Sequence, residues 1–482
     1  MTQLATDPIA PSPKRSPDAA WRRGFDDLSA EHGFTPLRVE GRLPAELTGT
    51  LYRNGPGGYG VAGERYRHWF DGDGAVSAVR LSGGQAFGAA RMVETKARER
   101  ERQAGRRLFG SYDTPLSRPI REVFLGDRRN PANTSLLLWQ ERLFALCEAG
   151  RPFEMSPRDL ASLGETDLSG QITHAFSAHP HYVPARRTTY NFGCGRGKNT
   201  PVSVYALPDE GPARRIADFT VEGARFHHDF AATERHLVFA FSPFYVSLWS
   251  LLTGKSPISG GAWRADRGTE IVVVPIDQPD RIVRFTVDSF HLEHVVNAFE
   301  RDGQIVFDYI HYSELRGLEQ YVGRVSSGVV QGPLASEVRR LVVDPAKRTT
   351  RSETILAQPV ELPRVSPRVD AKPHRIAYYA GFSQTSQAAS SIFDAIVRHD
   401  VENGAVTTYT PGAGLYPSEG VFVPRRDSSA EDDGWLLTMV FDARENRSHL
   451  QVLDARALGD GPVARCHFDH AIPFGFHGIW AA

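Results

Sequence analysis

The segment AIPFGFHGIW, residues 471–480, lies near the end of the 482-residue chain and carries one histidine, His477. Chain termini usually fray and carry little function, but this segment is apolar, aromatic and rich in glycine. A β structure that closes on itself leaves no unpaired edge, and closure often pairs strands from both ends of the chain. We therefore expect the segment to lead into an ordered strand that completes a closed β fold.

Short β-strands account for most of the remaining sequence. Runs of Val, Ile, Leu, Phe and Tyr are bounded by Gly, Pro, Asp or Asn and separated by turn sequences such as RDGQ, VENGAV and EDDGW. These runs are 142–149, 235–242, 269–277, 304–312, 375–382, 434–442 and 448–456. Helices are expected to be few and to lie chiefly around 156–163 (SPRDLASL) and 311–320 (HYSELRGLEQ). The pattern predicts an all-β protein, either a propeller, a large barrel or several sandwiches.

The N-terminal sequence differs from the rest of the chain. Residues 1–20 are rich in Pro, Ser and Ala, which predicts a disordered tail. No linker-like composition interrupts the chain after the tail, so residues 21–482 are expected to form a single domain. The first 25 residues contain no apolar run of signal-peptide length, and no uninterrupted apolar run elsewhere approaches the roughly 20 residues that span a bilayer, so we expect a soluble protein.

Charge and cysteine content narrow the class of protein. Lys and Arg total 56 and Asp and Glu total 57, so the formal net charge is -1. This balance disfavours nucleic acid, or an anionic membrane, as the main partner. The three cysteines are scattered and form no CxxC pair, so they suggest no disulfide framework. We expect a cytoplasmic protein.

One segment breaks the alternation of apolar and polar residues. Residues 241–254, FSPFYVSLWSLLTG, are apolar on nearly every side apart from three serines. A buried loop or helix is one interpretation. The other is an exposed apolar patch that makes peripheral contact with a membrane or admits a lipophilic substrate.

Four histidines lie in constrained local sequence, where Pro, Gly, Asp or Asn stand beside aromatic residues. They are His179 in SAHPHYVP, His228 in RFHHDF, His294 in HVVNAFE and His477 in PFGFHGIW. Their spacings are too wide for a zinc finger or an HExxH helix, but they suit ligands delivered one at a time by separate blades of a closed β structure. Taken singly, each histidine is more simply explained as a structural residue.

Three glutamates in apolar surroundings strengthen the metal-site interpretation. They are Glu148 in LCEAG, Glu361 in PVELPRV and Glu419 in YPSEGVFVP. A lone charge in such surroundings costs free energy, whereas a carboxylate behind a metal-ligating imidazole holds its second N–H and offsets the charge of the metal. Solvent-facing positions at strand ends would explain the same three residues equally well.

Eight motifs, taken in order along the chain, resemble those of the carotenoid cleavage oxygenases. They are LYRNGPG (51–57), HWFDGDG (68–74), NPANTSLL (130–137), SAHPHYVP (177–184), HHDFAATE (227–234), HVVNAFE (294–300), SEGVFVP (418–424) and PFGFHGIW (473–480). The resemblance runs from residue 35 to the C-terminus. The length and the sequence of residues 430–455 are most similar to the microbial apocarotenoid 15,15'-oxygenase branch.

The resemblance implies a seven-bladed β-propeller with a non-haem Fe(II) on its axis and a few helices and loops capping one face. The implied iron ligands are His179, His228, His294 and His477. In the same motifs His227 and His291 are neighbours of ligands and not ligands themselves. Glu148, Glu361 and Glu419 would support three of the ligands, Thr134 would lie near an open iron position, and Cys147, Phe226 and Glu293 would line the substrate tunnel.

The chemistry implied by the resemblance is the insertion of both oxygen atoms of O2 across a C=C bond. The partners would be O2 and a lipophilic polyene, an apocarotenoid or carotenoid, which yields two carbonyl products with retinal as one expected product. No side-chain general base is required. The metal supplies the reactivity, and the protein supplies positioning in a dry tunnel.

Three positions depart from the family pattern. Cys147 precedes Glu148, where the apocarotenoid branch usually has Trp and stilbene-cleaving relatives have a phenol-binding Lys. Glu293 precedes His294, where Phe is usual, and Ala75 stands in place of the usual Met. The acid at 293 would point outward, bind a polar end group or alter the chemistry.

Alternative functions remain open at this point. Cleavage of a stilbene or phenylpropanoid is weakened by the missing Lys, and isomerisation is weakened because the membrane segments of the animal branch are not seen. A non-catalytic carotenoid-binding propeller is disfavoured by the complete set of four histidines and three glutamates. A propeller that serves only as an interaction module stays open for any all-β chain of this length, and metal analysis of the purified protein would distinguish it from the others.

Overall fold

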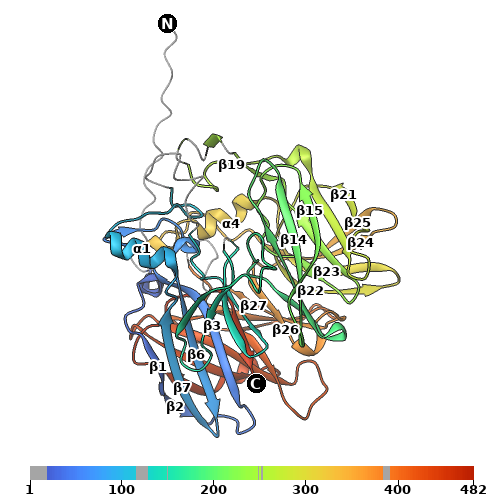
Figure 1. The fold of residues 1–482 in the computed structure, drawn as a ribbon. Helices are drawn as coiled ribbons and strands as arrows, with labels where there is room; N and C mark the ends of the chain where they lie inside the picture. The colour runs from blue at the N-terminus through green and yellow to red at the C-terminus, as the bar shows by residue number, and fades with distance from the viewer. Residues whose placement is uncertain are drawn as a thin grey trace.

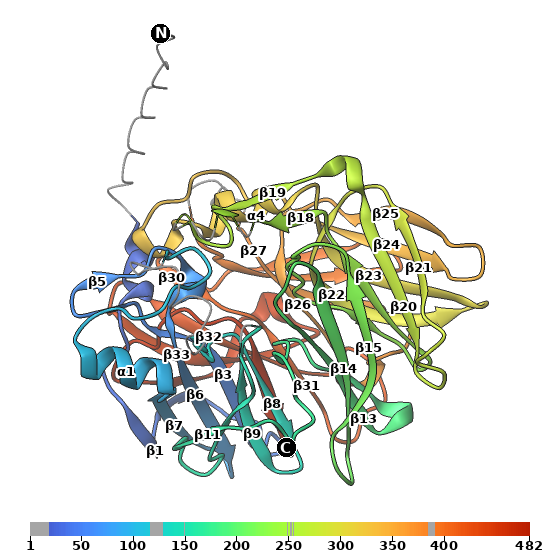
Figure 2. The ribbon, with the colours of Figure 1, turned by 45° about the horizontal axis from the view of Figure 1, so that its top comes forward.

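Seven sheets of four or more strands stand around a common axis in the computed structural model (Figures 1 and 2). The structure describes residues 19–115, 129–148, 150–247, 249–250, 253, 255–383 and 391–482. This arrangement confirms the seven-bladed β-propeller. The predicted tail falls almost wholly outside the described residues, so the tail and the division of the chain at residue 21 stay predictions.

The first four blades each contain four or five antiparallel strands. Blade one has the order β1 (His32–Pro36), β7 (Gln85–Met92), β6 (Asp73–Ser82), β3 (Gly49–Gly58) and β35 (Gly478–Ala481). Blade two contains β11 (Ser162–Glu165), β10 (Phe153–Met155), β9 (Arg142–Leu146) and β8 (Ser135–Trp139). Blade three contains β12 (His181–Val183), β13 (Thr188–Cys194), β14 (Thr200–Pro208) and β15 (Arg214–Val221). Blade four contains β16 (Ala231–Ala232), β17 (His236–Phe241), β20 (Thr269–Pro275) and β21 (Val283–Val287).

The other three blades complete the ring. Blade five contains β22 (His291–Arg301), β23 (Gln304–Tyr312), β24 (Glu337–Asp344) and β25 (Thr349–Leu356). Blade six contains β26 (Glu361–Val365), β27 (Ile376–Gly381), β28 (Ala395–Asp400) and β29 (Val406–Tyr409). Blade seven contains β2 (Arg38–Gly41), β34 (Pro462–His467), β33 (Arg447–Asp454) and β32 (Gly434–Asp442), which pairs with both β30 (Leu415–Pro417) and β31 (Val421–Pro424).

The apolar runs in the sequence form strands of these blades. All of the predicted runs contain a strand, and the middle strands are the most deeply buried, as in β27, where every residue is buried. Blades pack face to face, so a middle strand is covered on both faces and its apolar residues run without interruption. Outer strands such as β25 are mostly exposed and carry polar residues.

Both ends of the chain close the ring, as the opening segment predicts. β35 pairs with β3 as the innermost strand of blade one, with Arg53 opposite Gly478. β2 pairs with β34 as the outermost strand of blade seven, with Arg38 opposite His467. The first and the last blade are therefore each completed by a strand from the far end of the chain.

The two described α-helices and two short ribbons lie together on one side of the blades (Figures 1 and 2). The described α-helices are α1 (Lys96–Ala104) and α4 (Leu315–Val322), and the ribbons are β4 (Gly60–Val61) with β5 (Glu64–Arg65) and β18 (Phe244–Val246) with β19 (Gly261–Trp263). The 3-10 turns are η1 (Ala20–Phe25), η2 (Trp69–Asp71), η3 (Pro184–Arg186), η4 (Ala265–Arg267), η5 (Val325–Ser327), η6 (Pro367–Val369) and η7 (Leu458–Asp460). None of the helices in the described ranges is long and apolar enough to cross a membrane.

One of the two predicted helices forms and the other does not. α4 confirms the prediction at 311–320, whereas 156–163 is a turn that leads into β11. Ser156 and Asp159 accept hydrogen bonds from backbone N–H groups two residues further on, and Leu160 has a positive φ of 61°. Such local side-chain bonds compete with a helix, so the prediction of a helix there is wrong.

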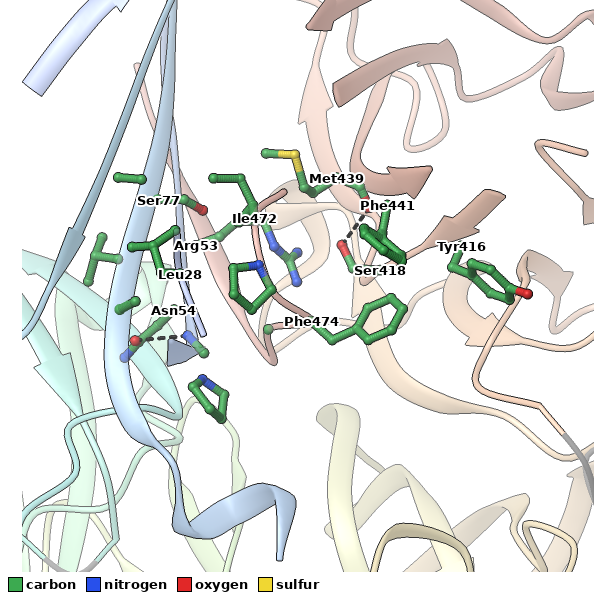
Figure 3. Close-up of a pocket in the computed structure, with 17 residues that line it drawn as sticks. Leu28, Arg53, Asn54, Ser77, Tyr416, Ser418, Met439, Phe441, Ile472 and Phe474 are labelled. Atoms are coloured by element: carbon green, nitrogen blue, oxygen red, sulfur yellow. Dashed lines mark hydrogen bonds between the residues drawn. The ribbon is translucent and has the colours of Figure 1, made fainter. Parts of the chain in front are cut away.

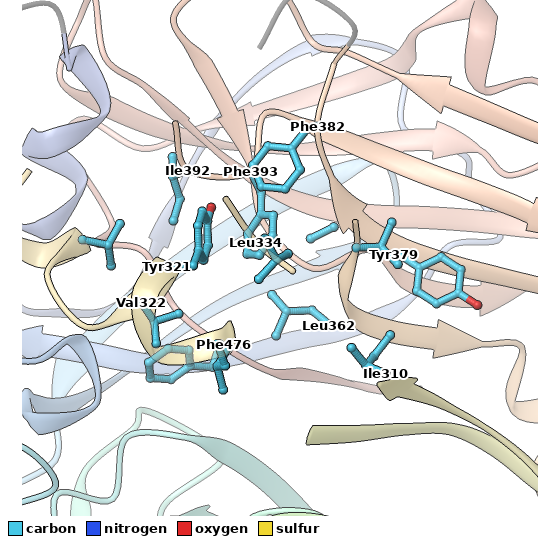
Figure 4. Packing of buried hydrophobic residues seen from close by; sticks show 14 of the residues in the cluster. Ile310, Tyr321, Val322, Leu334, Leu362, Tyr379, Phe382, Ile392, Phe393 and Phe476 are labelled. Atoms are coloured by element: carbon cyan, nitrogen blue, oxygen red, sulfur yellow. The ribbon is translucent and has the colours of Figure 1, made fainter. Parts of the chain in front are cut away.

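A large apolar cluster joins α4 to the centre of the propeller. Figure 4 shows Tyr321 and Val322 of α4 packed with Phe382, Phe393 and Phe476. Because Phe476 directly precedes His477 in the sequence, the cluster reaches the predicted metal site.

The segment 241–254 is divided between buried and exposed residues. Phe241 and Phe244 are buried, whereas the side chain of Trp249 is 74% exposed. Residues 248, 251, 252 and 254 of this segment lie outside the described part of the chain.

Candidate metal centre

The four predicted ligands lie at or near the starts of inner strands. His179 stands two residues before β12, His228 lies between β15 and β16, His294 is in β22 and His477 directly precedes β35. The inner strands surround the axis, so side chains at their starts converge there. Four separate blades therefore each deliver one imidazole to the same place.

The four imidazoles form one buried cluster. Ring centroids are 4.3 Å apart for His179 and His228, 4.8 Å for His179 and His477, and 5.0 Å for His294 and His477. His228 Nε2 lies 3.2 Å from His294 Nε2. One nitrogen each of His179, His228 and His294 falls within a group whose atoms are all within 4.8 Å of one another. The cluster has the donor set and spacing to hold a metal ion.

Each predicted glutamate lies behind a histidine. Glu361 Oε2 is 2.6 Å from His294 Nδ1 and Glu419 Oε1 is 2.9 Å from His477 Nδ1. Glu148 Oε1 is 2.7 Å from His228 Nδ1, although both atoms lack a hydrogen bond of normal geometry. A carboxylate on Nδ1 fixes the ring and leaves Nε2 for a metal. The three pairs leave the Nε2 atoms of these rings for the centre of the cluster.

His179 differs from the other three because no carboxylate holds it. Its buried Nε2 makes no hydrogen bond among the described residues, and Glu148 Oε1 is 3.9 Å away. Burial, together with His228 and His477, holds the pKa of His179 well below its usual range. A neutral ring with a buried, unsatisfied nitrogen facing three other imidazoles fits a metal ligand.

Glu419 is the centre of a buried charge network. Burial alone would raise the pKa of its carboxyl group, but Arg364, His477 and Arg53 hold that pKa far below the usual range. Arg364 Nε lies 2.8 Å from Oε1 and Arg53 Nη1 lies 3.4 Å from Oε2. The N–H of Gly478 also donates to Oε2, at 2.7 Å. The same carboxylate thus holds His477 and the start of β35.

The network around Glu361 is smaller. Tyr312 donates its hydroxyl to Glu361 Oε1 at 2.7 Å, and the N–H of Leu362 donates to Oε2 at 2.9 Å. Burial lowers the pKa of His294, but Glu361 more than offsets this and leaves it raised. Leu362 has a φ of 52°, the left-handed region that a leucine rarely adopts.

Polar residues of the motifs tie the ligand segments together. Asn54 in LYRNGPG exchanges backbone hydrogen bonds with Phe476 and His477, and its amide donates to the carbonyl groups of Ala132 and Ser135. Asp229, next to His228, accepts a hydrogen bond of 2.7 Å from the N–H of Val295, next to His294. These clamps hold segments that lie in different blades.

The sequence motifs contain most of these partners without revealing their roles. Arg53 and Asn54 lie in LYRNGPG and Asp229 in HHDFAATE, so their motif positions were the available signal. Arg364 and Tyr312 had no such signal, because they meet their carboxylates only after different blades pack together.

The histidine next to a predicted ligand and the predicted tunnel residues lie at different places around the cluster. His227 stacks on Phe241 with ring centroids 4.2 Å apart and packs away from the cluster. Phe226 stacks over His228 at 6.2 Å. The N–H of His477 donates to the carbonyl oxygen of Thr134 at 3.3 Å, and Cys147 is buried opposite Phe176.

Glu293 points inward. Its side chain is 3% exposed, with Oε2 2.7 Å from His291 Nε2 and Oε1 3.6 Å from His228 Nε2. Burial would raise its pKa, but His228 and His291 lower it to about 2. Burial likewise disfavours protonation of His228, yet Glu293 and Glu148 raise its pKa to about 10. The acid therefore contacts the cluster itself.

A second polar group lies beside Phe226. The ring of Tyr112 is 5.8 Å from that of Phe226, and its hydroxyl donates to Glu319 Oε1 at 2.7 Å. Glu319 Oε2 lies 3.3 Å from Nε2 of the fully buried His68. Burial, followed by Glu319 and Glu293, raises the pKa of Tyr112 well above its usual value. Polar groups therefore accompany the aromatic side chains near the cluster.

A small cavity lies behind the His477 segment (Figure 3). Its volume is about 30 Å³, and Arg53, Ser418, Phe441 and Phe474 are among its lining residues. A space of this size holds about one water molecule. It is too small for a polyene.

Comparisons with known proteins agree with the geometry. The family model described as retinal pigment epithelial membrane protein, RPE65, matches residues 25–482. The apocarotenoid-15,15'-oxygenase of Synechocystis sp. is 31% identical, with 99% of this chain and 100% of the relative covered. The isoeugenol monooxygenase of Pseudomonas putida is 30% identical, with 92% and 94% covered. The solved structure of cobalt-substituted Synechocystis apocarotenoid oxygenase has a TM-score of 0.88 at 30% identity and covers 96% of this chain and 98% of that one. The chain therefore belongs to the RPE65 family of carotenoid cleavage oxygenases.

Proposed function

We propose that this protein is an Fe(II)-dependent dioxygenase that cleaves a C=C bond of an apocarotenoid, with retinal as one product. The observation that carries the proposal is the buried cluster of His179, His228, His294 and His477 with a carboxylate behind three of its members. The likeness to the Synechocystis apocarotenoid-15,15'-oxygenase supports the choice of substrate class. Fe(II), when bound by these imidazoles, supplies the activation of O2.

Side chains of the protein bind the substrate, orient the metal ligands and shield the site. Glu361 and Glu419 hold the rings of His294 and His477 so that their other nitrogens face the metal. Phe226, which stacks over His228, supplies an apolar surface for a polyene. Both atoms of O2 enter the products, one on each carbon of the cleaved bond, so the reaction needs no proton donor or base from the protein.

The test is anaerobic reconstitution with Fe(II), followed by aerobic incubation with detergent-dispersed apo-8'-carotenal and mass analysis of the products. A retinal-length aldehyde is expected only with iron. His477→Ala is expected to lose both iron and product. The matched control is His467→Ala, because His467 lies on the outer part of blade seven and contacts Glu40.

Two results would contradict the proposal in different ways. Bound iron with unchanged apo-8'-carotenal would refute the apocarotenoid substrate but leave the metal site standing. No bound iron in the wild-type protein would refute the dioxygenase itself.

A second candidate function is cleavage of a phenylpropanoid or stilbene. Tyr112, Glu319 and Glu293 offer polar partners to a phenol hydroxyl, which a hydrocarbon chain does not need. A relative from Chaetomium globosum is named resveratrol cleavage oxygenase 1 and another is the isoeugenol monooxygenase. Turnover of resveratrol or isoeugenol by the iron-loaded protein, lowered in Tyr112→Phe, would favour this candidate over apocarotenoid cleavage.

We also propose a cytoplasmic location, with contact to a membrane surface through residues 241–254. The exposed Trp249 supports this because tryptophan favours the interface between water and lipid. Co-sedimentation with phosphatidylcholine vesicles tests it. Wild-type protein is expected to sediment with the vesicles and Trp249→Ser to stay in solution, and equal behaviour of the two would refute the contact.

A further inference from the structure

Glu293 and His294 are consecutive residues, yet both reach the histidine cluster. Successive side chains of a regular strand point to opposite faces. In β22 the pairing with β23 shifts between Leu292 and Val295, as it does in a β-bulge. A bulge re-aims a side chain, so the local irregularity places the carboxylate of Glu293 on the same side as the imidazole of His294.

The two oxygens of Glu293 have different surroundings. Oε2 is held by His291 Nε2 at 2.7 Å, and His291 Nδ1 lies 3.0 Å from the hydroxyl of Ser242. Oε1 makes no hydrogen bond to any of the residues that the structure describes and lies 3.6 Å from His228 Nε2. His228 Nδ1 already faces Glu148, so its Nε2 is the nitrogen left for a metal. One oxygen therefore anchors the carboxylate and the other faces the metal-binding nitrogens.

The distance from Glu293 to His228 is compatible with a shared metal ion. Metal–nitrogen bonds to imidazole are about 2.1 Å long, so neighbouring ligand atoms around a metal stand about 3 Å apart. His228 Nε2 is 3.2 Å from His294 Nε2 and 3.6 Å from Glu293 Oε1. The carboxylate oxygen thus lies nearly as close to His228 as a second imidazole ligand does.

The charge balance points the same way. Glu293 is 3% exposed, and within the described part of the chain its charged partners are histidines, with no Lys or Arg in contact. When these imidazoles are neutral, as metal ligands are, the buried carboxylate has no counter-charge, which is costly. Four neutral imidazoles leave the charge of a divalent metal unbalanced, so a carboxylate beside them relieves both costs.

We propose that Glu293 is a fifth protein ligand of the metal, with Oε1 as the donor atom and His291 as the residue that aims it. This proposal rests on the four-histidine site described under the proposed function. The carboxylate adds one negative charge to the centre and occupies a position that would otherwise be open to a small molecule.

The test uses Co(II) bound to the full chain, because the visible absorption of Co(II) depends on coordination number and donor type. The named cobalt-substituted relative makes Co(II) a suitable probe. Glu293→Gln is expected to change the visible spectrum and to weaken Co(II) binding by at least about 10-fold in a competition titration against a chelator. Far-ultraviolet circular dichroism establishes that each variant is folded.

Two control variants separate ligation from charge and from strand stability. Glu300→Gln removes a carboxylate of the same strand that contacts Thr233 and His236 instead, so spectrum and affinity are expected to stay as in the wild type. Glu293→Asp keeps the charge but withdraws the oxygen by about 1.5 Å. If Glu293 is a ligand, the Asp variant will resemble Glu293→Gln.

Every outcome bears on the proposal. An unchanged Co(II) spectrum in Glu293→Gln, or an Asp variant that matches the wild type, overturns ligation and leaves Glu293 as a charge partner of His228 and His291. If the wild type binds no Co(II), or binds it as tightly after His179→Ala, the four-histidine site fails and the proposal fails with it. The latter result is distinguishable because it does not involve residue 293.

Discussion

The two sides of the histidine cluster are held in different ways. His477 pairs with Glu419, which is completely buried and contacts Arg53 and Arg364. His228 pairs with Glu148, which is 19% exposed and, among the described residues, contacts only histidines. His179 has no carboxylate of its own.

This difference means that the fold positions one side of the cluster more firmly than the other. Glu419 and its arginines hold the strand that closes the ring, so the fold itself sets the position of His477. His179 and His228 lie on the side that also contains Phe226 and Glu293, and among the described residues no arginine contacts the carboxylate beside them. A bound metal is expected to order this second side more than the first.

The largest expected effect comes from neutralising each side's carboxylate in turn. Glu419→Gln leaves Arg53, which is 4% exposed, buried beside Arg364 without a counter-charge and is expected to cost about 3–5 kcal/mol of stability. Glu148→Gln is expected to cost less than about 1 kcal/mol, because that group is partly solvated. Urea unfolding of the metal-free proteins at pH 7 measures both values. Equal losses of stability in the two variants would contradict the proposed difference between the two sides of the cluster.

A smaller effect is expected when the histidines themselves are removed. His477→Ala takes away a donor to the buried Glu419 and is expected to cost the metal-free protein about 1–3 kcal/mol more than His179→Ala. Both variants should lose the stabilisation by metal, which is about 2.7 kcal/mol when the metal is at 100 times its Kd. Thermal unfolding with and without Co(II) checks this, and metal stabilisation retained by either variant would contradict it.

The smallest effect on stability is expected for Tyr312. This residue contacts Glu361, the third carboxylate behind the histidines, and so extends the comparison of the two sides. Tyr312→Phe removes one hydrogen bond to Glu361 and should cost about 1 kcal/mol. Glu361→Gln should weaken Co(II) binding by about 10- to 100-fold, and the Tyr312 variant should weaken it less. A larger effect of the tyrosine on affinity would place it closer to the metal chemistry than its contacts indicate.

The sequence predicts the strands well and the helices poorly. Middle strands are buried on both faces, so runs such as 434–442 are apolar throughout and easy to recognise. α1, with the sequence KARERERQA, has only Ala97 and Glu101 buried and therefore no apolar stripe to detect. The number of blades came from the family resemblance, because the runs themselves show no repeat.

Some residues of the candidate site could also be predicted from the sequence and others could not. The four histidines and three glutamates could be identified from the sequence, and the structure places each glutamate beside a histidine, although which glutamate pairs with which histidine was not predicted. The ligand and tunnel roles of these residues remain predictions. The pairing of Arg364 and Arg53 with Glu419 could not be predicted, because these contacts between blades join residues 55 and 366 positions apart. The inward direction of Glu293 depends on an irregularity of pairing that no residue pattern reveals.

The pairing of β35 with β3 has a consequence for how the protein folds. Arg53 and Gly478 face each other across almost the whole chain, and β2 and β34 are similarly remote. Contacts of such sequence separation are slow to form because a very long loop must close first. Ring closure is therefore expected to be a late event on the folding pathway, and until it occurs His477 is absent from the centre. Uptake of metal by all four histidines should consequently follow the slowest phase of refolding.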